Sequence, residues 1–131
     1  MYWSRKSVIH TGLLCFVFFV AAQTLMAQGT YYPPVGTQVT CWDNREFLGQ
    51  SQRPFSADPS PQAVGSQLLN RISSIKVPRG LRVTLIDSNN PNEPDPRRRV
   101  TIYPGYYPYI GQWEDRTDFI LVEEIDPNEM Y

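Results

Sequence analysis

Carboxylates are the side chains with the most obvious chemical potential near the end of this chain. Glu114, Asp115 and Asp118 lie within five positions of one another. A pair of carboxylates performs acid–base catalysis in glycoside cleavage. That reaction needs a cleft, and a chain of 131 residues is not expected to form a deep one. We therefore do not expect these carboxylates to be catalytic.

The N-terminal segment has the features of a secretory signal peptide. Arg5 and Lys6 precede an apolar run of ten residues, 13–22, and a more polar stretch follows with small residues at Ala22 and Ala27. This order is typical of a cleaved signal, whereas an uncleaved anchor helix needs about 20 apolar residues. We predict cleavage after Ala27, with Ala22 as the alternative. The mature protein is then secreted or periplasmic, without a membrane span.

Loss of residues 1–27 would limit the remaining chemistry. His10 is the one histidine of the chain and Cys15 is one of its two cysteines, so both would leave with the signal. Without histidine, Ser-His and Cys-His catalysis are excluded and the commonest zinc ligand is missing. Cys41 cannot form an internal disulfide alone and is interpreted as a buried strand residue; an intermolecular disulfide is the alternative. We predict that the protein is not an enzyme.

Composition narrows the class further. Twelve prolines argue against long helices, and 131 residues suffice for one domain. The formal net charge is −1. Removing Arg5 and Lys6 leaves 10 basic residues against 13 acidic ones, a net charge of −3. No basic field is available for nucleic-acid binding, which we exclude.

An internal repeat is the strongest pattern of the mature chain. Residues 39–43 (VTCWD) recur as 83–87 (VTLID), 44 positions later. Residues 67–77 (QLLNRISSIKV) recur as 112–122 (QWEDRTDFILV), 45 positions later. Two separate blocks with almost the same offset indicate a duplicated unit.

The repeated units have the pattern of strands. Residues 81–86 alternate with the two-residue period of a half-buried strand, and residues 72–77 are interpreted in the same way. Only 61–69 is a candidate helical turn. Short strands between turns predict a β-sandwich. Turn-rich stretches occur at 56–61, 89–96 and 103–108.

Three features together resemble the βγ-crystallin family. Residues 42–49 (WDNREFLG) fit its hairpin pattern of an aromatic, four residues, an aromatic, any residue and glycine. Residues 69–74 (LNRISS) resemble its signature of two Asn or Asp, two variable residues, Ser or Thr, and Ser. The duplication matches a domain of two motifs. The resemblance implies an all-β, two-sheet Greek-key β-sandwich preceded by the signal peptide.

The predicted organisation follows from the resemblance and the signal. A signal peptide (1–27) and an N-terminal lead (28–35) precede a βγ-crystallin-like domain (36–125), which consists of motif one (36–78) and motif two (79–125). An acidic tail (126–131), expected to be frayed, ends the chain.

Microbial members of this family often bind Ca²⁺ in these turns, and the resemblance implies two sites here. The first would combine Asn70 and Ser73 with the backbone carbonyl of Asp87. The second would combine Asp115 and Asp118 with the carbonyl of Asp43. Oxygen donors of this kind suit a hard cation.

Departures from the family pattern rank the second site above the first. Leu69 stands where an Asn or Asp is expected, and Asn70 is neutral. In motif two, Glu114, Asp118 and Phe119 replace signature residues, but Asp118 still offers a charged ligand. The long stretch 88–99 replaces the aromatic hairpin of motif two, whose backbone carbonyl the resemblance assigns to the first site. We expect a dissociation constant of about 10⁻⁴ to 10⁻³ M. The alternative is that the signature only holds the turns together.

Two other clusters have a functional and a structural interpretation. The arginines 97–99 are either an anion or partner contact or part of an exposed loop neutralised by its own acids, and we favour the loop. Four tyrosines (103, 106, 107 and 109) either stack on sugars or a partner, or pack on the sheet with their hydroxyls in water, which we favour.

The functional hypothesis is therefore an exported, non-enzymatic module with a structural, stress-related or binding role and Ca²⁺ as its possible ligand. Its partner would be another protein or a cell surface. The alternative is a secreted protease inhibitor, or another domain that binds a protein partner, with the stretch 88–99 as an inserted element.

Overall fold

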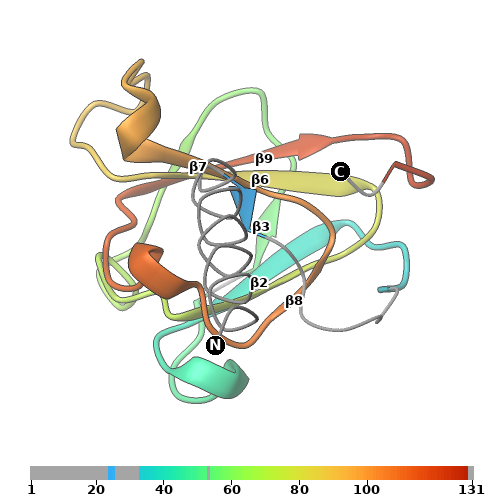
Figure 1. Cartoon of the computed structure of the whole chain (residues 1–131), viewed down its shortest axis with the longest axis horizontal. Helices are drawn as coiled ribbons and strands as arrows, with labels where there is room; N and C mark the ends of the chain where they lie inside the picture. Colours follow the sequence, from blue (N-terminus) through green and yellow to red (C-terminus); the bar gives the residue numbers. More distant parts are fainter. Residues whose placement is uncertain (1–23, 26–32, 53, 130–131) are drawn as a thin grey trace, which may run out of the picture.

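The structure is a computed structural model that describes residues 24–25, 33–52 and 54–129. Within these residues the chain forms strands in two layers, with three short 3-10 helices in the connections (Figure 1). The strands are β1 (Thr24–Leu25), β2 (Gln38–Trp42), β3 (Phe55–Ser56), β4 (Gln62–Ala63), β5 (Ser74–Val77), β6 (Leu81–Ile86), β7 (Arg99–Ile102), β8 (Gly105–Tyr107) and β9 (Phe119–Glu124). The 3-10 helices are η1 (Arg45–Phe47), η2 (Pro96–Arg98) and η3 (Gly111–Trp113).

The two predicted motifs exchange strands, so that each sheet contains strands of both motifs. One sheet has the order β3-β2-β5-β8 and the other β1-β7-β6-β9-β4. Strand β4 of the first half joins the second sheet, and β8 of the second half joins the first. All neighbours are antiparallel except β1 and β7. This exchange confirms the predicted two-sheet Greek-key sandwich.

Strand β1 falls inside the segment predicted as a signal peptide. Thr24 and Leu25 pair in parallel with Thr101 and Ile102 of β7. The rest of the predicted signal, residues 1–23 and 26–27, lies outside the described residues. Among the described residues, no helix is long and apolar enough to span a membrane.

The core lies between the inner faces of the two sheets. Alternate residues of each strand point inward because the side-chain period of a strand is two. Burial of such aliphatic side chains is the main contribution to the stability of a sandwich without long helices. The inward set includes Val39, Cys41, Ile75, Val77, Val83, Leu85, Val100, Ile102, Ile120 and Val122, all at most 1% exposed.

Three local expectations need adjustment. The strand predicted over 72–77 begins only at Ser74, because the preceding residues belong to a loop. The candidate helical turn in 61–69 reduces to one turn, in which the Leu69 N–H donates to the Gly65 carbonyl at 2.9 Å. The tail is not frayed at its start: Arg79 Nε donates to the Pro127 carbonyl at 3.3 Å, which holds the tail against the β5–β6 turn.

Candidate metal-binding loops

Four of the six predicted ligand residues lie on two loops, the first loop (66–73) and the second loop (111–118). Each loop contains one non-glycine residue with a left-handed backbone: Asn70 has φ 55° and Asp115 has φ 63°. Asn and Asp tolerate this conformation better than most residues. The two positions are 45 residues apart, so the repeated sequence folds into a repeated backbone geometry.

The two loops lie against each other and exchange hydrogen bonds. The Asn70 N–H donates to the Thr117 carbonyl at 3.0 Å, and the Asp115 N–H donates to the Ile72 carbonyl at 3.1 Å. Donors and acceptors are again 45 positions apart. This reciprocal pair confirms the predicted internal repeat in three dimensions.

Each loop is also fixed to the first strand of its own motif. The Ser73 N–H donates to the carbonyl of Trp42 at the end of β2, at 2.9 Å. The Asp118 N–H donates to the carbonyl of Ile86 at the end of β6, at 2.8 Å. The strand ends therefore determine where the loops present their side chains.

The first hairpin (43–50) has the geometry that its sequence predicts. Gly49 has φ +86°, a conformation that L side chains rarely adopt. The rings of Trp42 and Phe47 meet edge to face with centroids 5.4 Å apart. The aromatic pair and the glycine together fold the hairpin back over its sheet.

The second hairpin (87–98) lacks this aromatic pair and is held by its own polar side chains instead. The Asp95 carboxylate accepts the Arg97 N–H at 2.9 Å and its guanidinium at 3.0 Å. The Arg99 guanidinium donates to the Glu93 carbonyl at 3.0 Å. The Asp95–Arg97 pair matches the predicted neutralisation of the loop by its own acids, whereas Arg99 donates to a backbone carbonyl.

The two hairpin aspartates have arginine partners. Arg116 places its Nε and Nη2 atoms each 3.0 Å from Asp87 Oδ2. Asp43 Oδ2 lies 3.6 Å from an Arg71 guanidinium nitrogen, and its Oδ1 accepts the Gln50 N–H at 2.7 Å. Both carboxylates are thus engaged by side chains of their own motif.

The first hairpin also contacts the second loop. Arg45 Nε donates to Glu114 Oε2 at 3.0 Å, and its guanidinium stacks 3.9 Å from the centroid of the Tyr109 ring. The hydrogen bond from Arg45, with a further one from Ser73, holds the pKa of Glu114 below its usual value. The Ser73 side chain, which the resemblance assigns to the first metal site, is buried at 4% exposure.

The tyrosines mainly serve the fold. The Tyr107 hydroxyl donates to the Tyr103 carbonyl at 2.8 Å. The expectation that this hydroxyl lies in water is therefore wrong. The Lys76 ammonium lies 4.7 Å from the centroid of the Tyr106 ring. Only Tyr109, at 42% exposure, offers a largely open ring edge.

The side-chain oxygens of the second loop suit a hard cation better than those of the first loop. The second loop presents the exposed carboxylate of Asp115 and the half-buried one of Asp118. The Thr117 hydroxyl in this loop is buried and lacks a hydrogen-bond partner. The first loop offers the neutral Asn70, and Leu69 is 43% exposed where an acidic residue is expected.

The described part of the chain contains no group of three or more His, Cys, Asp or Glu side chains that would hold a metal by themselves. A cation at the second loop would therefore rely on two carboxylates and on backbone or hydroxyl oxygens. Such a site has little charge, which is consistent with weak binding.

Sequence reasoning missed the arginines around these loops. Arg71 and Arg116 occupy the same variable position of the two signatures, 45 residues apart. The repeat alignment contained this signal, because an identical basic residue recurs at the same position of both signatures. Their partners, Asp43 and Asp87, are a further repeated pair, 44 residues apart.

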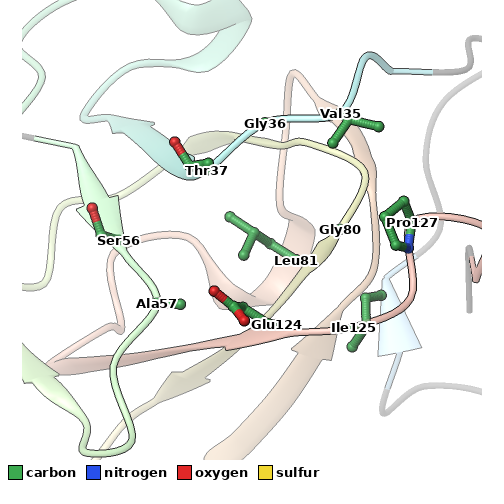
Figure 2. Close-up of a pocket in the computed structure, with 10 residues that line it drawn as sticks. All are labelled: Val35, Gly36, Thr37, Ser56, Ala57, Gly80, Leu81, Glu124, Ile125 and Pro127. Carbon is green, nitrogen blue, oxygen red and sulfur yellow. The ribbon is translucent and has the colours of Figure 1, made fainter.

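A hollow of about 450 Å³ lies at the far ends of β6 and β9 from these loops. Val35, Leu81 and Ile125 contribute apolar surface, and Figure 2 shows the Glu124 carboxylate among them. No second titratable side chain lines this hollow. It therefore does not bring an acid–base pair together.

Comparisons with known proteins find similarity in three-dimensional structure and not in sequence. No protein-family model matches the sequence, and the search of curated proteins found no match either. Solved structures do match. The N-terminal domain of Protein S is 22% identical, with a TM-score of 0.51, over 67% of this chain and 97% of that domain.

Two further structures extend the similarity to other organisms. A βγ-crystallin domain of Abundant Perithecial Protein from Neurospora crassa, determined in a Ca²⁺-bound form, is 14% identical over 75% of this chain and 97% of its own, with a TM-score of 0.55. A βγ-crystallin domain from Flavobacterium johnsoniae is 16% identical over 66% of this chain and 93% of its own, with a TM-score of 0.53. The predicted resemblance is thus confirmed at the level of the fold.

Proposed function

We propose that this chain, which has the βγ-crystallin fold, is an exported, non-enzymatic module that binds Ca²⁺ weakly at its second loop and is stabilised by it. The observation that carries the proposal is the presentation of Asp115 and Asp118 on a left-handed loop. An unpartnered Thr117 hydroxyl lies between them in the sequence. The Ca²⁺-bound form of the Neurospora crassa domain supports the choice of ion.

The charges around the second loop favour a low affinity. Arg116 of the second loop pairs with Asp87, and Arg45 pairs with Glu114. Both guanidinium groups reduce the negative potential that the loop offers to a divalent cation. Binding in the range of extracellular modules follows, with a dissociation constant of about 10⁻⁴ to 10⁻³ M.

Weak binding still produces a measurable stabilisation. At 1 mM Ca²⁺ such affinities stabilise the folded state by about 0.4 to 1.4 kcal/mol. For a domain of this size the melting midpoint then rises by roughly 2 to 10 °C. A thermal melt in 1 mM CaCl₂, compared with EDTA and with 1 mM MgCl₂, measures this rise.

Variants assign the effect to the second loop. Asp118→Asn and Asp115→Asn should each remove the Ca²⁺-dependent rise. Glu124→Gln is the matched control, because it neutralises an exposed acid at the opposite end of β9 and should keep the rise. An unchanged midpoint in Ca²⁺ for the unmodified protein would refute metal binding and leave the signature as a structural turn.

Export is the other part of the proposal, and the mature N-terminus tests it. Cleavage after Ala27 removes the two residues of β1, whereas cleavage after Ala22 retains them. Mass spectrometry of the protein recovered outside the cytoplasm distinguishes these products. A full-length chain found only in the cytoplasm would contradict export.

A partner-binding role, including protease inhibition, is the second candidate. The observation in its favour is that the second hairpin extends from the sandwich and is held by its own hydrogen bonds (Figure 1). Replacing residues 89–96 by a short turn should then remove binding to a co-secreted target. Stability and the Ca²⁺ response should persist in that variant.

A further inference from the structure

Both hairpins are closed by the same backbone hydrogen bond. The Asp43 N–H donates to the Gln50 carbonyl at 3.0 Å, and the Asp87 N–H donates to the Arg98 carbonyl at 2.9 Å. Gln50 and Arg98 are therefore structural counterparts in the two motifs. They differ in charge, and this difference falls beside the carbonyl that the family resemblance assigns to the first metal site.

The Arg98 side chain is hydrogen-bonded to the backbone carbonyl of Asp87. Its Nη1 atom donates to the Asp87 backbone oxygen at 3.1 Å. Arg116 covers the carboxylate of the same residue, with two nitrogens each 3.0 Å from Oδ2. Asp87 thus interacts with two guanidinium groups from its own chain.

The other donors assigned to the first site cannot offset this positive charge. Asn70 is neutral, and Leu69 brings an apolar side chain to the signature. Ser73 is 4% exposed, so its hydroxyl presents little open surface to a cation. A Ca²⁺ ion at the Asp87 carbonyl would lie next to the Arg98 guanidinium without a free carboxylate between them, and like charges repel at such short range.

We propose that Arg98 is the resident cation of the first site: its guanidinium takes the place of the metal at the Asp87 carbonyl and excludes Ca²⁺ from the first loop. The end of the sandwich formed by the second hairpin is then stabilised without metal. The inference rests on the proposed function only for the choice of ion, because it can be tested without the second site.

The test uses Arg98→Gln, which installs the residue found at the corresponding position of the first hairpin. The backbone carbonyl that closes the hairpin is kept, and only the guanidinium is lost. The variant is made in the Asp118→Asn background, so that the second site does not contribute. Thermal melts in 10 mM CaCl₂, 10 mM MgCl₂ and EDTA are compared for the single and double variants.

We expect the Asp118→Asn protein to melt at the same temperature with and without Ca²⁺. The double variant should melt lower in EDTA and recover about 2 °C or more in CaCl₂. Arg97→Gln is the matched control, because it removes a neighbouring positive charge whose partner is Asp95, and it should gain no Ca²⁺ response.

Two outcomes would overturn the inference. One is a double variant that shows no Ca²⁺ response, since Arg98 would then not be what excludes the ion. The other is an Asp118→Asn protein that retains a Ca²⁺ response abolished by Asn70→Ala, since the first loop would then bind metal beside Arg98. Neither outcome depends on whether the second loop binds Ca²⁺.

Discussion

The hydroxyl of Ser74 bonds to two points of the first hairpin from below: it donates to the Asn44 carbonyl at 2.6 Å and accepts the Phe47 N–H at 3.1 Å. The Ser74 side chain itself is fully buried. At the corresponding position of the second motif stands Phe119. The second hairpin accordingly uses its own carboxylates and arginines to hold its shape.

Ser74→Ala should therefore destabilise the protein by about 1 to 3 kcal/mol, because it removes two part-buried hydrogen bonds that hold the first hairpin. Urea denaturation measures the loss. Ser66→Ala, at an exposed position of the first loop, is the control and should change the free energy of unfolding by about 0.5 kcal/mol or less. Equal losses in the two variants would argue against this role of Ser74.

Gly49→Ala should cost more than Gly111→Ala. Both glycines have positive φ, +86° and +63°, so alanine is strained at either position. Only at Gly49 would the added Cβ overlap Asp43 Oδ1; at Gly111 it meets nothing within 4 Å. The midpoints of thermal unfolding compare the two variants. If they are equally destabilised, the close approach of Asp43 has no energetic role.

Alkaline pH should weaken the protein through Cys41. Burial raises the pKa of this thiol well above its usual value. The folded state therefore keeps the proton while the unfolded chain releases it, and stability present below about pH 8.5 falls as pH rises. The expected slope is about 1.4 kcal/mol per pH unit.

Urea denaturation between pH 7 and 10 measures this slope. Cys41→Ala is the control, because it removes the thiol and should abolish the decline between about pH 8.5 and 10. Tyr107, whose pKa burial also raises, adds a second decline above about pH 10. A Cys41→Ala variant that retains the full decline would contradict the assignment.

Acid should loosen the contact between the first hairpin and the second loop. The hydrogen bond from Arg45 holds the pKa of Glu114 below its usual value, so the carboxylate contributes stability that is lost as pH falls through the lowered pKa. Urea midpoints measured from pH 6 down to pH 3 should fall less steeply in Glu114→Gln than in the unmodified protein. Parallel profiles would show that the pair contributes nothing.

Local sequence predicted a large part of the fold because its signals are local or periodic. Strands β2 and β6 follow from alternation and from β-branched residues, and the repeat offsets of 44 and 45 reappear in paired hydrogen bonds. Gly49 and Asn70 have the backbone conformations that their types allow. Each of these features depends on a few neighbouring residues.

The partners of the charged and hydroxyl side chains were not predictable in the same way. Arg45 pairs with Glu114 across 69 positions, and the Ser73 side chain is buried beneath the loops. The family resemblance assigned Ser73 to a metal ligand set, and no pattern around it indicates that its side chain is buried. A side chain pairs with whichever partner lies nearest in the folded protein, and differences of a few ångströms between candidate partners cannot be inferred from the sequence.

The sequence by itself determined the duplicated all-β design and the acidic character of the second loop, since residue type and spacing control which face of each strand points inward. Only the tertiary structure decided which strands cross between the sheets and which cation meets each carbonyl. Long-range electrostatic and hydrogen-bonding partners depend on how whole loops dock. For this reason Arg98, one of three consecutive arginines in the sequence, acquires a specific role only when the second hairpin closes on Asp87.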